Sequence, residues 1–427
     1  MESSLPNRWR FVAAALVMQL CLGVLYAWSV FRGPLAQLHD WSKATTIAPY
    51  RYSLLLFTVA MIVGGFWQDR KGPRIVASAG GFLLGTGCLL AAWLGDTARG
   101  LIFSYGVVGG LGVGFAYVTP IATCIKWFPD KRGLIVGLAV MGFGSGSLIF
   151  APLLEALIGA DPARFAETIP RTFLIMAAIF YVCVIGAAQF YRVPPAGWKP
   201  AGWASAAGTG SQARPDYSAA GMAGTWQLYA LWITYFLGAS VGLTVIGEAA
   251  TLVAEMGKAG AFLSAGAALG AMSLFNGLGR LSWGMLSDRI GRNAAIVLMF
   301  VNYVFACLVL LRDAAGFLPL VAGICLVGFS FGGFLAIMPA LTADYYGSKN
   351  LGANYGILFT AYGLSAYFVP AYVAGIMDGA RQSGSLAAGY SRVFLILAAI
   401  AVGGGLFAML ARRPAHRAAS QTAAATD

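Results

Sequence analysis

The stretch SLFNGLGRLSWGMLSDRIGR, residues 273–292, places one arginine, Arg280, inside a run that otherwise reads as buried helix. A guanidinium group stays charged at every physiological pH and can donate two parallel hydrogen bonds to a carboxylate. Asn276 lies four residues earlier, so on a helix its amide shares a face with Arg280 and could donate to the same anion. The pair therefore predicts a binding site for an organic anion.

The elements that must position Arg280 read as membrane-spanning helices. The chain of 427 residues is 59% hydrophobic and 10% charged, and its mean hydropathy is +0.75. Apolar runs of roughly 18 to 25 residues, each long enough to cross about 30 Å of hydrocarbon as a helix, recur along its length. The sequence therefore predicts an all-α membrane protein, embedded in the lipid bilayer, with twelve transmembrane helices. Their expected extents are 10–30, 46–67, 75–94, 101–125, 133–157, 173–191, 228–254, 262–286, 294–311, 316–340, 353–377 and 391–411.

Arg280 lies well inside one of these predicted helices. It precedes Asp288, near the helix end, by eight residues, which places it roughly 12 Å from that end and close to the middle of the membrane. A central arginine costs about 3 kcal/mol on insertion scales, and such residues usually face a cavity and mark a substrate path. The alternative is a structural salt bridge with Glu248 or Glu155, the two acids within the predicted runs.

The chain repeats itself at an offset of 219 residues. The stretches GFWQDRKGPR, residues 65–74, and GMLSDRIGRN, residues 284–293, share a glycine, an Asp-Arg pair and a second glycine at identical spacing. The same offset pairs Gly133 with Gly352. These matches indicate duplication of a six-helix unit.

The duplicated units are expected to form two pseudo-symmetric six-helix halves. A segment rich in proline, glycine, serine and alanine separates them and reads as a linker. The last residues are short, polar and expected to be disordered. The predicted divisions are an N-terminal half at 1–191, a cytoplasmic linker at 192–224, a C-terminal half at 225–411 and a cytoplasmic tail at 412–427.

The positive charges follow the predicted topology and do not form one patch. The net charge is +12, and 17 of the 28 lysines and arginines fall in the termini and in the segments that share their side of the membrane. This bias matches the positive-inside rule and places both termini in the cytoplasm, as expected for a bacterial inner-membrane protein. It gives no support for nucleic acid as a partner.

The residue patterns needed for several other functions are missing from the sequence. The six cysteines lie in apolar runs without paired or metal-ligand spacing, and both histidines lie outside the runs. No Walker A loop or zinc signature is present. We therefore expect no metal, no cofactor and no catalytic residue. A monomer is the oligomeric state that we expect, although no sequence pattern indicates it.

The two copies of G-x-x-x-D-R-x-G, together with twelve predicted spans, resemble the major facilitator superfamily. The stretch IKWFPDKRGLIVGLAVMGFGSG, residues 125–146, resembles the oxalate/formate exchanger family and, more loosely, animal-type monocarboxylate transporters. NRW at residues 7–9, GVLYAWSVF in the first run and NYG at the start of the eleventh agree with this resemblance. The resemblance covers the whole chain and implies a secondary transporter that works by alternating access.

The resemblance also implies a substrate site around Arg280. This arginine matches the family's arginine in the eighth helix, which pairs with the substrate carboxylate, whereas its repeat partner, Met61, is uncharged. Tyr26, Tyr117 and Phe331 match positions where the exchangers place aromatic residues around their substrate. For each of these aromatic residues the alternative is helix packing or a place in the interface belt.

Two positions depart from the families. Tyr362 stands where the oxalate exchangers have a lysine, so one membrane cation is present instead of two. Because an uncompensated buried charge is costly, this favours a monoanion such as lactate, pyruvate, acetate or formate over oxalate. Tyr362 can still donate a hydrogen bond. Asn276 stands where animal-type monocarboxylate transporters carry an aspartate that helps to move a proton, and asparagine cannot ionise.

Asp69 and Asp288, in the repeated loops, are candidate gating residues. Each lies near the cytoplasmic end of its predicted helix, where a carboxylate can bond to neighbouring helix N-termini or to arginines. With Arg70, Arg289 and Arg132, they could form contacts that break and re-form as the two halves rock. The alternative is that these loops only fix a tight turn and the orientation of the chain.

The sequence thus predicts a transporter of a small monocarboxylate anion and not an enzyme. Proton-coupled symport is the first hypothesis, with the proton carried by the substrate itself or by an acid such as Glu248. Obligatory carboxylate exchange is the alternative, and the lack of an aspartate at position 276 favours it. A sensor that keeps this fold without transporting is a third hypothesis, which the short C-terminal segment does not support.

Overall fold

The computed structural model describes residues 7–195, 198–200, 216–256, 265–312 and 316–414, and all regular structure in these ranges is helical. The first half contains α1 (Trp9–Leu22), a 3₁₀ segment (Gly23–Ala27), α2 (Ser29–His39), α3 (Lys43–Lys71), α4 (Pro73–Leu94), α5 (Ala98–Leu101), a π-helical segment (Ile102–Gly109), α6 (Gly110–Trp127), α7 (Arg132–Ile158), a short 3₁₀ turn (Pro162–Arg164) and α8 (Phe165–Ala188). The second contains α9 (Ala219–Ala223), α10 (Trp226–Met256), α11 (Ala265–Ile290), α12 (Arg292–Phe305), a π-helical segment (Ala306–Leu311), α13 (Phe317–Tyr346), α14 (Leu351–Gln382) and α15 (Leu386–Leu410).

The long apolar helices confirm the predicted all-α membrane fold. Within the described residues, eleven helices are long and apolar enough to cross a membrane. The remaining run of the twelve expected is α11, which has 26 residues and would extend roughly 39 Å. Its polar residues Asn276 and Arg280 lower its hydropathy, so the helix that carries the candidate site has the weakest apolar signal.

Several helices extend beyond the apolar runs. The run expected at 173–191 begins at Phe165 as α8, and the first run continues through α2 to His39. Each extension contains a proline, Pro170 in α8 and Pro34 in α2. Transmembrane helices tolerate such prolines because neighbouring groups satisfy the freed carbonyls.

The sequence repeat corresponds to two equivalent turns. Gly72, between α3 and α4, has φ of 87°, and Gly291, between α11 and α12, has φ of 91°. These values lie in the left-handed region, which only glycine adopts without strain. The two glycines of the repeat therefore let each half reverse direction at the same place.

The repeat also creates two equivalent helix crossings between the halves. A Cβ added to Gly65 in α3 would overlap the backbone of Gly352 in α14. At the positions 219 residues away, a Cβ on Gly284 in α11 would overlap the backbone of Gly133 in α7. The α3–α14 and α7–α11 crossings are thus close backbone contacts, and we call them together the seam.

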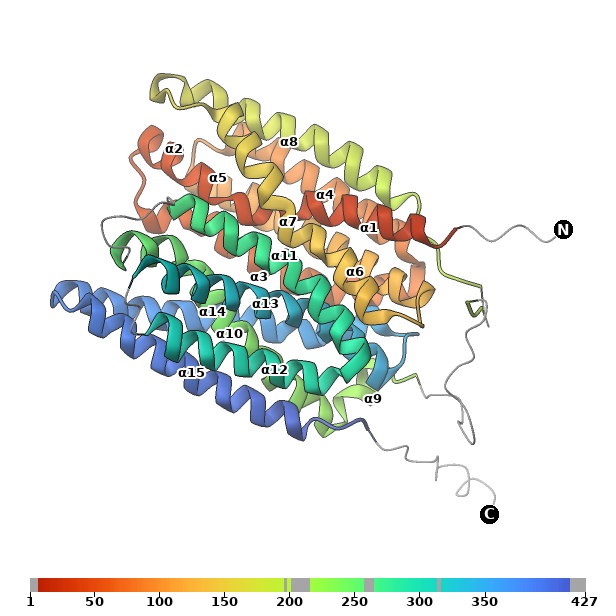
Figure 1. Cartoon of the computed structure of the whole chain (residues 1–427). Coiled ribbons are helices and arrows are strands. Elements are labelled where there is room, and N and C mark those ends of the chain that lie inside the picture. The colour runs from red at the N-terminus through yellow and green to blue at the C-terminus, as the bar shows by residue number, and fades with distance from the viewer. Residues whose placement is uncertain (1–6, 196–197, 201–215, 257–264, 313–315, 415–427) are drawn as a thin grey trace, which may run out of the picture.

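The bundle places the seam helices between two outer groups. In Figure 1, α7 and α11 run side by side in the middle, with α4 and α8 on one side and α12 and α15 on the other. The two ends of the described chain leave the bundle at the same end (Figure 1). The first of these ends is tied to the α6–α7 loop by the Arg8–Asp130 ion pair, whose Nη1 to Oδ1 distance is 2.8 Å.

Candidate functional site

Arg280 is fully buried in α11 and bonds across the seam. Its Nε donates to Oδ1 of Asn276 at 3.1 Å, and its Nη1 donates to the carbonyl oxygen of Val140 in α7 at 2.8 Å. Its guanidinium carbon lies 5.5 Å from the ring centroid of Phe143, also in α7. The third nitrogen, Nη2, is buried without a hydrogen-bond partner in the described part of the chain. The arginine therefore links the halves, and one of its nitrogens has no partner among the described atoms.

The described acids do not neutralise Arg280. No carboxylate among the described side chains lies within ion-pair distance of its guanidinium group. Glu248 lines a small cavity of about 10 Å³ between α10, α14 and α15, and Glu155 is an exposed residue in the last turn of α7. The salt-bridge alternative for Arg280 thus has no support within the described residues.

Asn276 holds Arg280 in place. Its Oδ1 accepts from Arg280, and its Nδ2 donates to the carbonyl oxygen of Gly328 in α13 at 3.1 Å. A Cβ on Gly144 of α7 would lie 2.8 Å from Oδ1 of Asn276 and 2.9 Å from Nε of Arg280. Glycine at 144 therefore lets α7 approach the pair. Asn276 thus joins Arg280 to the backbone of α13.

The structure brings the four predicted aromatic residues together with this pair. The hydroxyl oxygens of Tyr26, in the 3₁₀ segment, and Tyr362, in α14, lie 3.4 Å apart across the halves. Phe331 in α13 stacks on Tyr362 with ring centroids 6.2 Å apart. Tyr26 and Tyr117 each contact the Phe143 ring edge-on at 5.1 Å, and Phe143 also faces Arg280. The six predicted residues therefore form one connected set.

Several residues of this cluster were not predicted from the sequence. Phe359 in α14 contacts a ring on each side of the seam: its centroid lies 5.1 Å from that of Phe57 in α3 and 4.7 Å from that of Tyr362. Tyr355 lies one turn before Phe359 on the same helix. The spacing of 355, 359 and 362 places all three on one helix face, and that periodicity was the available signal.

Buried hydroxyl groups without partners also gather here. The hydroxyls of Tyr117, Tyr235 and Tyr355 have no hydrogen-bond partner in the described part of the chain, although all three side chains are buried. Leaving such a group unsatisfied costs roughly 1–3 kcal/mol. The site therefore holds more hydrogen-bond donors than the described protein atoms use.

A second group of polar contacts lies where α3 and α11 end. The carboxylate of Asp288 accepts from the backbone N–H of Gly133 at 3.0 Å and of Leu134 at 2.9 Å, at the N-terminus of α7. Asp69 accepts from the N–H of Ala353 at 2.9 Å, at the N-terminus of α14. A helix N-terminus favours negative charge. Each half thus caps a helix of the other half, at positions related by the repeat.

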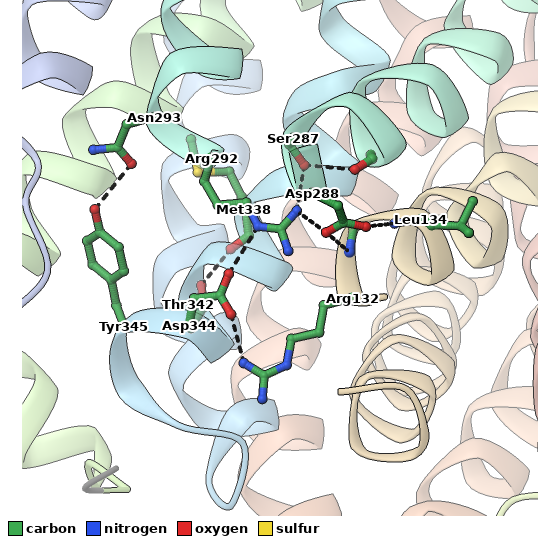
Figure 2. A network of polar contacts seen from close by, with 12 residues as sticks. Arg132, Leu134, Ser287, Asp288, Arg292, Asn293, Met338, Thr342, Asp344 and Tyr345 are labelled. Carbon is green, nitrogen blue, oxygen red and sulfur yellow. Dashed lines mark hydrogen bonds and ion pairs between the residues drawn. The ribbon is translucent and has the colours of Figure 1, made fainter. Parts of the chain in front are cut away.

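Ion pairs reinforce one of these caps, as Figure 2 shows. Arg132 of α7 pairs with Asp344 of α13 at 2.8 Å, and Arg292 pairs with both Asp288 at 2.6 Å and Asp344 at 3.0 Å. The chain of contacts from Arg132 through Asp344 and Arg292 to Asp288 spans the two halves. On the other side of the seam, Lys126 lies 3.5 Å from Asp69.

The predicted gating residues therefore divide into two groups. Asp69, Asp288 and Arg132 make contacts between the halves. Arg70 and Arg289 are exposed, and within the described residues neither makes a side-chain hydrogen bond or ion pair. Asp344, Arg292 and Lys126 were not predicted, because their pairing does not follow the 219-residue repeat.

Comparison with known families agrees with this architecture. The family model of the Major Facilitator Superfamily matches residues 11–311 and 233–426. The chain belongs to the major facilitator superfamily. It is 29% identical over 370 residues to the oxalate:formate antiporter of Oxalobacter formigenes, covering 85% of this chain and 84% of the relative. It is 26% identical over 355 residues to the apicoplast pyruvate carrier 1 of Toxoplasma gondii, covering 71% of this chain and 64% of the relative.

The solved structures support the same fold. The proton:xylose symporter XylE has a TM-score of 0.71 at 13% identity, with 95% of this chain and 96% of that chain covered. This facilitator-superfamily chain is therefore a multi-pass membrane transporter and not an enzyme. The resemblance inferred from the sequence motifs is confirmed at the level of the family.

Proposed function

We propose that this transporter carries short monocarboxylates by alternating access and that Arg280 binds the carboxylate between the two halves. The observation that carries the proposal is a fully buried arginine with no described acid beside it and one free nitrogen. Intramembrane cations of this kind mark substrate paths. The names of two relatives, an oxalate:formate antiporter and a pyruvate carrier, refer to small organic acids.

We propose a monoanion because Arg280 is the one cation of the proposed site among the described residues. Tyr362 offers a hydroxyl group, 3.4 Å from that of Tyr26, at the position where the oxalate exchangers have a lysine. A second substrate carboxylate there would be buried without a cation, and that desolvation is not repaid by a phenol. Lactate, pyruvate and acids of similar size fit this charge balance.

The contact between Arg280 and Val140 supplies a mechanism for coupling substrate to movement. Nη1 of Arg280 donates to the Val140 carbonyl, across the seam. A carboxylate that accepts hydrogen bonds from both Nη1 and Nη2 forms a bidentate, charge-assisted pair with Arg280. This pair replaces the contact between the halves. Substrate binding thereby releases one link of the seam, and the two halves then rock around the bound anion.

Coupling to a proton is the mode that we propose first. Val140, Asn276 and the Phe143 ring partly compensate the charge of Arg280 when no anion is bound. Symport requires the carrier to reorient without substrate, and Arg280 is then buried without an anion. The partial compensation of its charge makes that step feasible. The group that carries the proton then lies apart from the guanidinium, because no described acid contacts Arg280.

Carboxylate exchange is the second candidate. It needs no proton acceptor in the protein, and the described neighbours of Arg280 include no ionisable acid. In both cases we place the chain termini in the cytoplasm and the chain in a bacterial inner membrane, from the bias of its basic residues.

Uptake by proteoliposomes tests the function and separates the two modes. Labelled lactate is supplied outside substrate-free vesicles with an imposed inward proton gradient, and Arg280→Ala is reconstituted in parallel. Accumulation that Arg280→Ala abolishes supports symport through this site. Uptake only into vesicles preloaded with another carboxylate supports exchange. Absence of both would overturn the proposal.

Asn276→Asp is expected to make transport depend on pH. The new carboxylate would pair with Nε of Arg280, now 3.1 Å from Oδ1 of Asn276, and its charge would oppose binding of an anion. Burial, and an anion bound beside it, favour the neutral form of this carboxyl group and offset its pairing with the guanidinium group. Protonation at lower pH then removes the charge, so the ratio of variant to wild-type uptake should rise as pH falls from about 8 to 5. The measurement is initial uptake rate at fixed anion concentration. A ratio that stays constant would show that position 276 does not control the charge of the site.

Gly144→Ala is expected to weaken substrate binding without removing any polar group. Its methyl group would lie within 3 Å of both Asn276 and Arg280 and force them apart from α7. Overpacking of this kind costs about 1–3 kcal/mol, which corresponds to at least roughly fivefold in affinity. Gly186→Ala in α8 is the matched control, because nothing lies within 4 Å of a Cβ there. Equal KM values for both variants would contradict the proposed packing.

A further inference from the structure

A polar cavity lies between the last turn of α7 and the first turns of α8. Its volume is about 340 Å³, which is in the range of small-molecule sites. It lies roughly 24 Å along α7 from Val140, the residue that accepts a hydrogen bond from Arg280. In Figure 1 the connection between α7 and α8 is at the end of the bundle opposite to the two chain ends. The lining consists of residues 156–161, Arg164, Thr168 and Arg171, all in the first half.

The charged groups of the lining do not pair with one another. Arg164 and Arg171 are exposed, and within the described residues neither side chain makes a hydrogen bond or an ion pair. Asp161 accepts from the N–H of Ala163 at 3.0 Å, and no described lysine or arginine lies within ion-pair distance of its carboxylate. The cavity therefore presents two guanidinium groups and one carboxylate to a ligand.

Thr168 supplies a further polar group, at the least exposed part of the lining. The residue is 6% exposed, and its hydroxyl has no hydrogen-bond partner among the described atoms. Thr172, one turn later, donates to the carbonyl oxygen of Thr168 at 2.7 Å, a common bond for a threonine in a helix. Buried hydroxyl groups normally have a partner. Because Thr168 follows Arg164 by four residues and precedes Arg171 by three, it can donate to an acceptor oxygen that enters between the two arginines.

The cavity adjoins the lipid-facing surface of α8. Leu174, Ala178 and Val182 are exposed at four-residue spacing, and Arg171 precedes them on the same helix face. Arg171 lies roughly 26 Å along α8 from Ala188, and the hydrocarbon core of a bilayer is about 30 Å thick. An arginine near the end of a membrane helix extends its charged head to the interface. Arg171 is therefore expected at the level of the lipid headgroups.

Neighbouring acids make a simple anion a poor match for the cavity. Asp161 lines it, and Glu155 and Glu167 are exposed on adjacent turns of α7 and α8 without lining it. These three carboxylates outnumber Arg164 and Arg171, so the local charge does not favour an isolated anion. A ligand that carries one negative and one positive group suits this arrangement.

We propose that this cavity binds the headgroup of a zwitterionic phospholipid with a primary ammonium group, such as phosphatidylethanolamine. The phosphate oxygens accept from Arg164, Arg171 and Thr168, since arginine donates well to phosphate. The ammonium group donates to the Asp161 carboxylate, and the acyl chains lie along the exposed residues of α8. The inference does not depend on the proposed function, because the cavity shares no residue with the substrate site.

Native mass spectrometry of the full-length protein tests the proposal. Delipidated protein in a mild detergent is titrated with phosphatidylethanolamine and with phosphatidylglycerol of the same acyl chains, and separately with inorganic phosphate. The measured quantity is the equilibrium constant for the first bound molecule. Phosphatidylglycerol has the phosphate without the ammonium group, so wild type is expected to bind phosphatidylethanolamine roughly threefold to fivefold more tightly. Inorganic phosphate is expected not to compete with either lipid.

Two variants separate the phosphate and ammonium contacts. Arg171→Gln should weaken binding of both lipids at least about threefold, because both carry the phosphate. Asp161→Asn should weaken binding of phosphatidylethanolamine alone and so remove the preference, while asparagine keeps the capping bond to Ala163. Arg99→Gln is the matched control. Arg99 is exposed in α5, does not line the cavity and makes no side-chain hydrogen bond or ion pair within the described residues, so both constants should equal those of wild type.

Each other outcome counts against the proposal. Arg171→Gln constants equal to those of Arg99→Gln would show that the cavity does not hold the phosphate. A preference for phosphatidylethanolamine that survives Asp161→Asn would remove Asp161 from the site. Inorganic phosphate that displaces both lipids would assign the cavity to the free ion. Thermal unfolding of every variant is compared with that of wild type, and if Arg171→Gln does not fold, Asp161→Asn alone decides the result.

Discussion

Arg280→Lys is expected to reduce uptake of the transported monocarboxylate at least roughly 30-fold, because truncating a buried, hydrogen-bonded charge pair costs about 2–5 kcal/mol. The guanidinium group now bonds Asn276 through Nε and Val140 through Nη1 and still presents Nη2. A lysine ammonium is a point charge on a flexible stem and cannot hold these three directions at once. The measurement is initial uptake of labelled lactate into proteoliposomes.

Arg289→Lys is the control for this substitution. Arg289 lies on the same helix, is exposed, and makes no side-chain hydrogen bond or ion pair within the described residues, so its replacement should leave uptake unchanged. Thermal unfolding of both variants is compared with that of wild type. Near-normal uptake by a correctly folded Arg280→Lys protein would remove Arg280 from the site.

Asp288→Asn is the second large prediction, and it concerns the seam. The aspartate bonds two N–H groups of α7 and pairs with Arg292 at 2.6 Å. An asparagine amide can accept only part of this bonding, and it lacks the negative charge that the α7 N-terminus and Arg292 stabilise. Losing hydrogen bonds to a charged group costs about 1.5–3 kcal/mol. We expect the conformation with this end of the seam closed to lose roughly tenfold or more in population.

Distances between spin labels report this opening directly. Arg70 and Arg289 are exposed residues at the ends of α3 and α11, one in each half, and each can be replaced by cysteine in a protein whose native cysteines are removed. Double electron–electron resonance should show longer distances in Asp288→Asn. Asp130→Asn is the control, since Asp130 pairs with Arg8 inside the first half and should cause no shift. Identical distributions in all three proteins would mean that Asp288 does not hold the seam.

Hydropathy and the internal repeat made the membrane helices and the equivalent positions of the two halves predictable from the sequence. The 219-residue offset predicted Gly133 and Gly352 as equivalents, and in the structure both lie at close helix crossings. Arg280 was recognisable because a charge interrupts an apolar run and its repeat partner is Met61. Positions that match between the repeats therefore indicate the shared fold, and a position that differs between them indicates a candidate functional residue.

The parts that escaped prediction depend on the backbone or on long-range pairing. The acceptor for Nη1 is the carbonyl oxygen of Val140, and any residue type provides a carbonyl, so no sequence pattern identifies it. Asp344 pairs with Arg132 across 212 positions, and neither lies at the other's repeat equivalent. Helix ends such as Phe165 were missed because helices continue through prolines when neighbours satisfy the backbone.

The reciprocal capping of α7 by Asp288 and of α14 by Asp69 has a thermodynamic consequence. The two caps lie on opposite sides of the pseudo-symmetry axis, and each joins a helix of one half to a helix of the other. A rotation that moves the two halves apart at the end of the bundle where α3 and α11 end lengthens both caps together. Release of the two caps is therefore one cooperative event, so their contributions are coupled and not additive. The duplicated motif makes opening behave as a two-state switch.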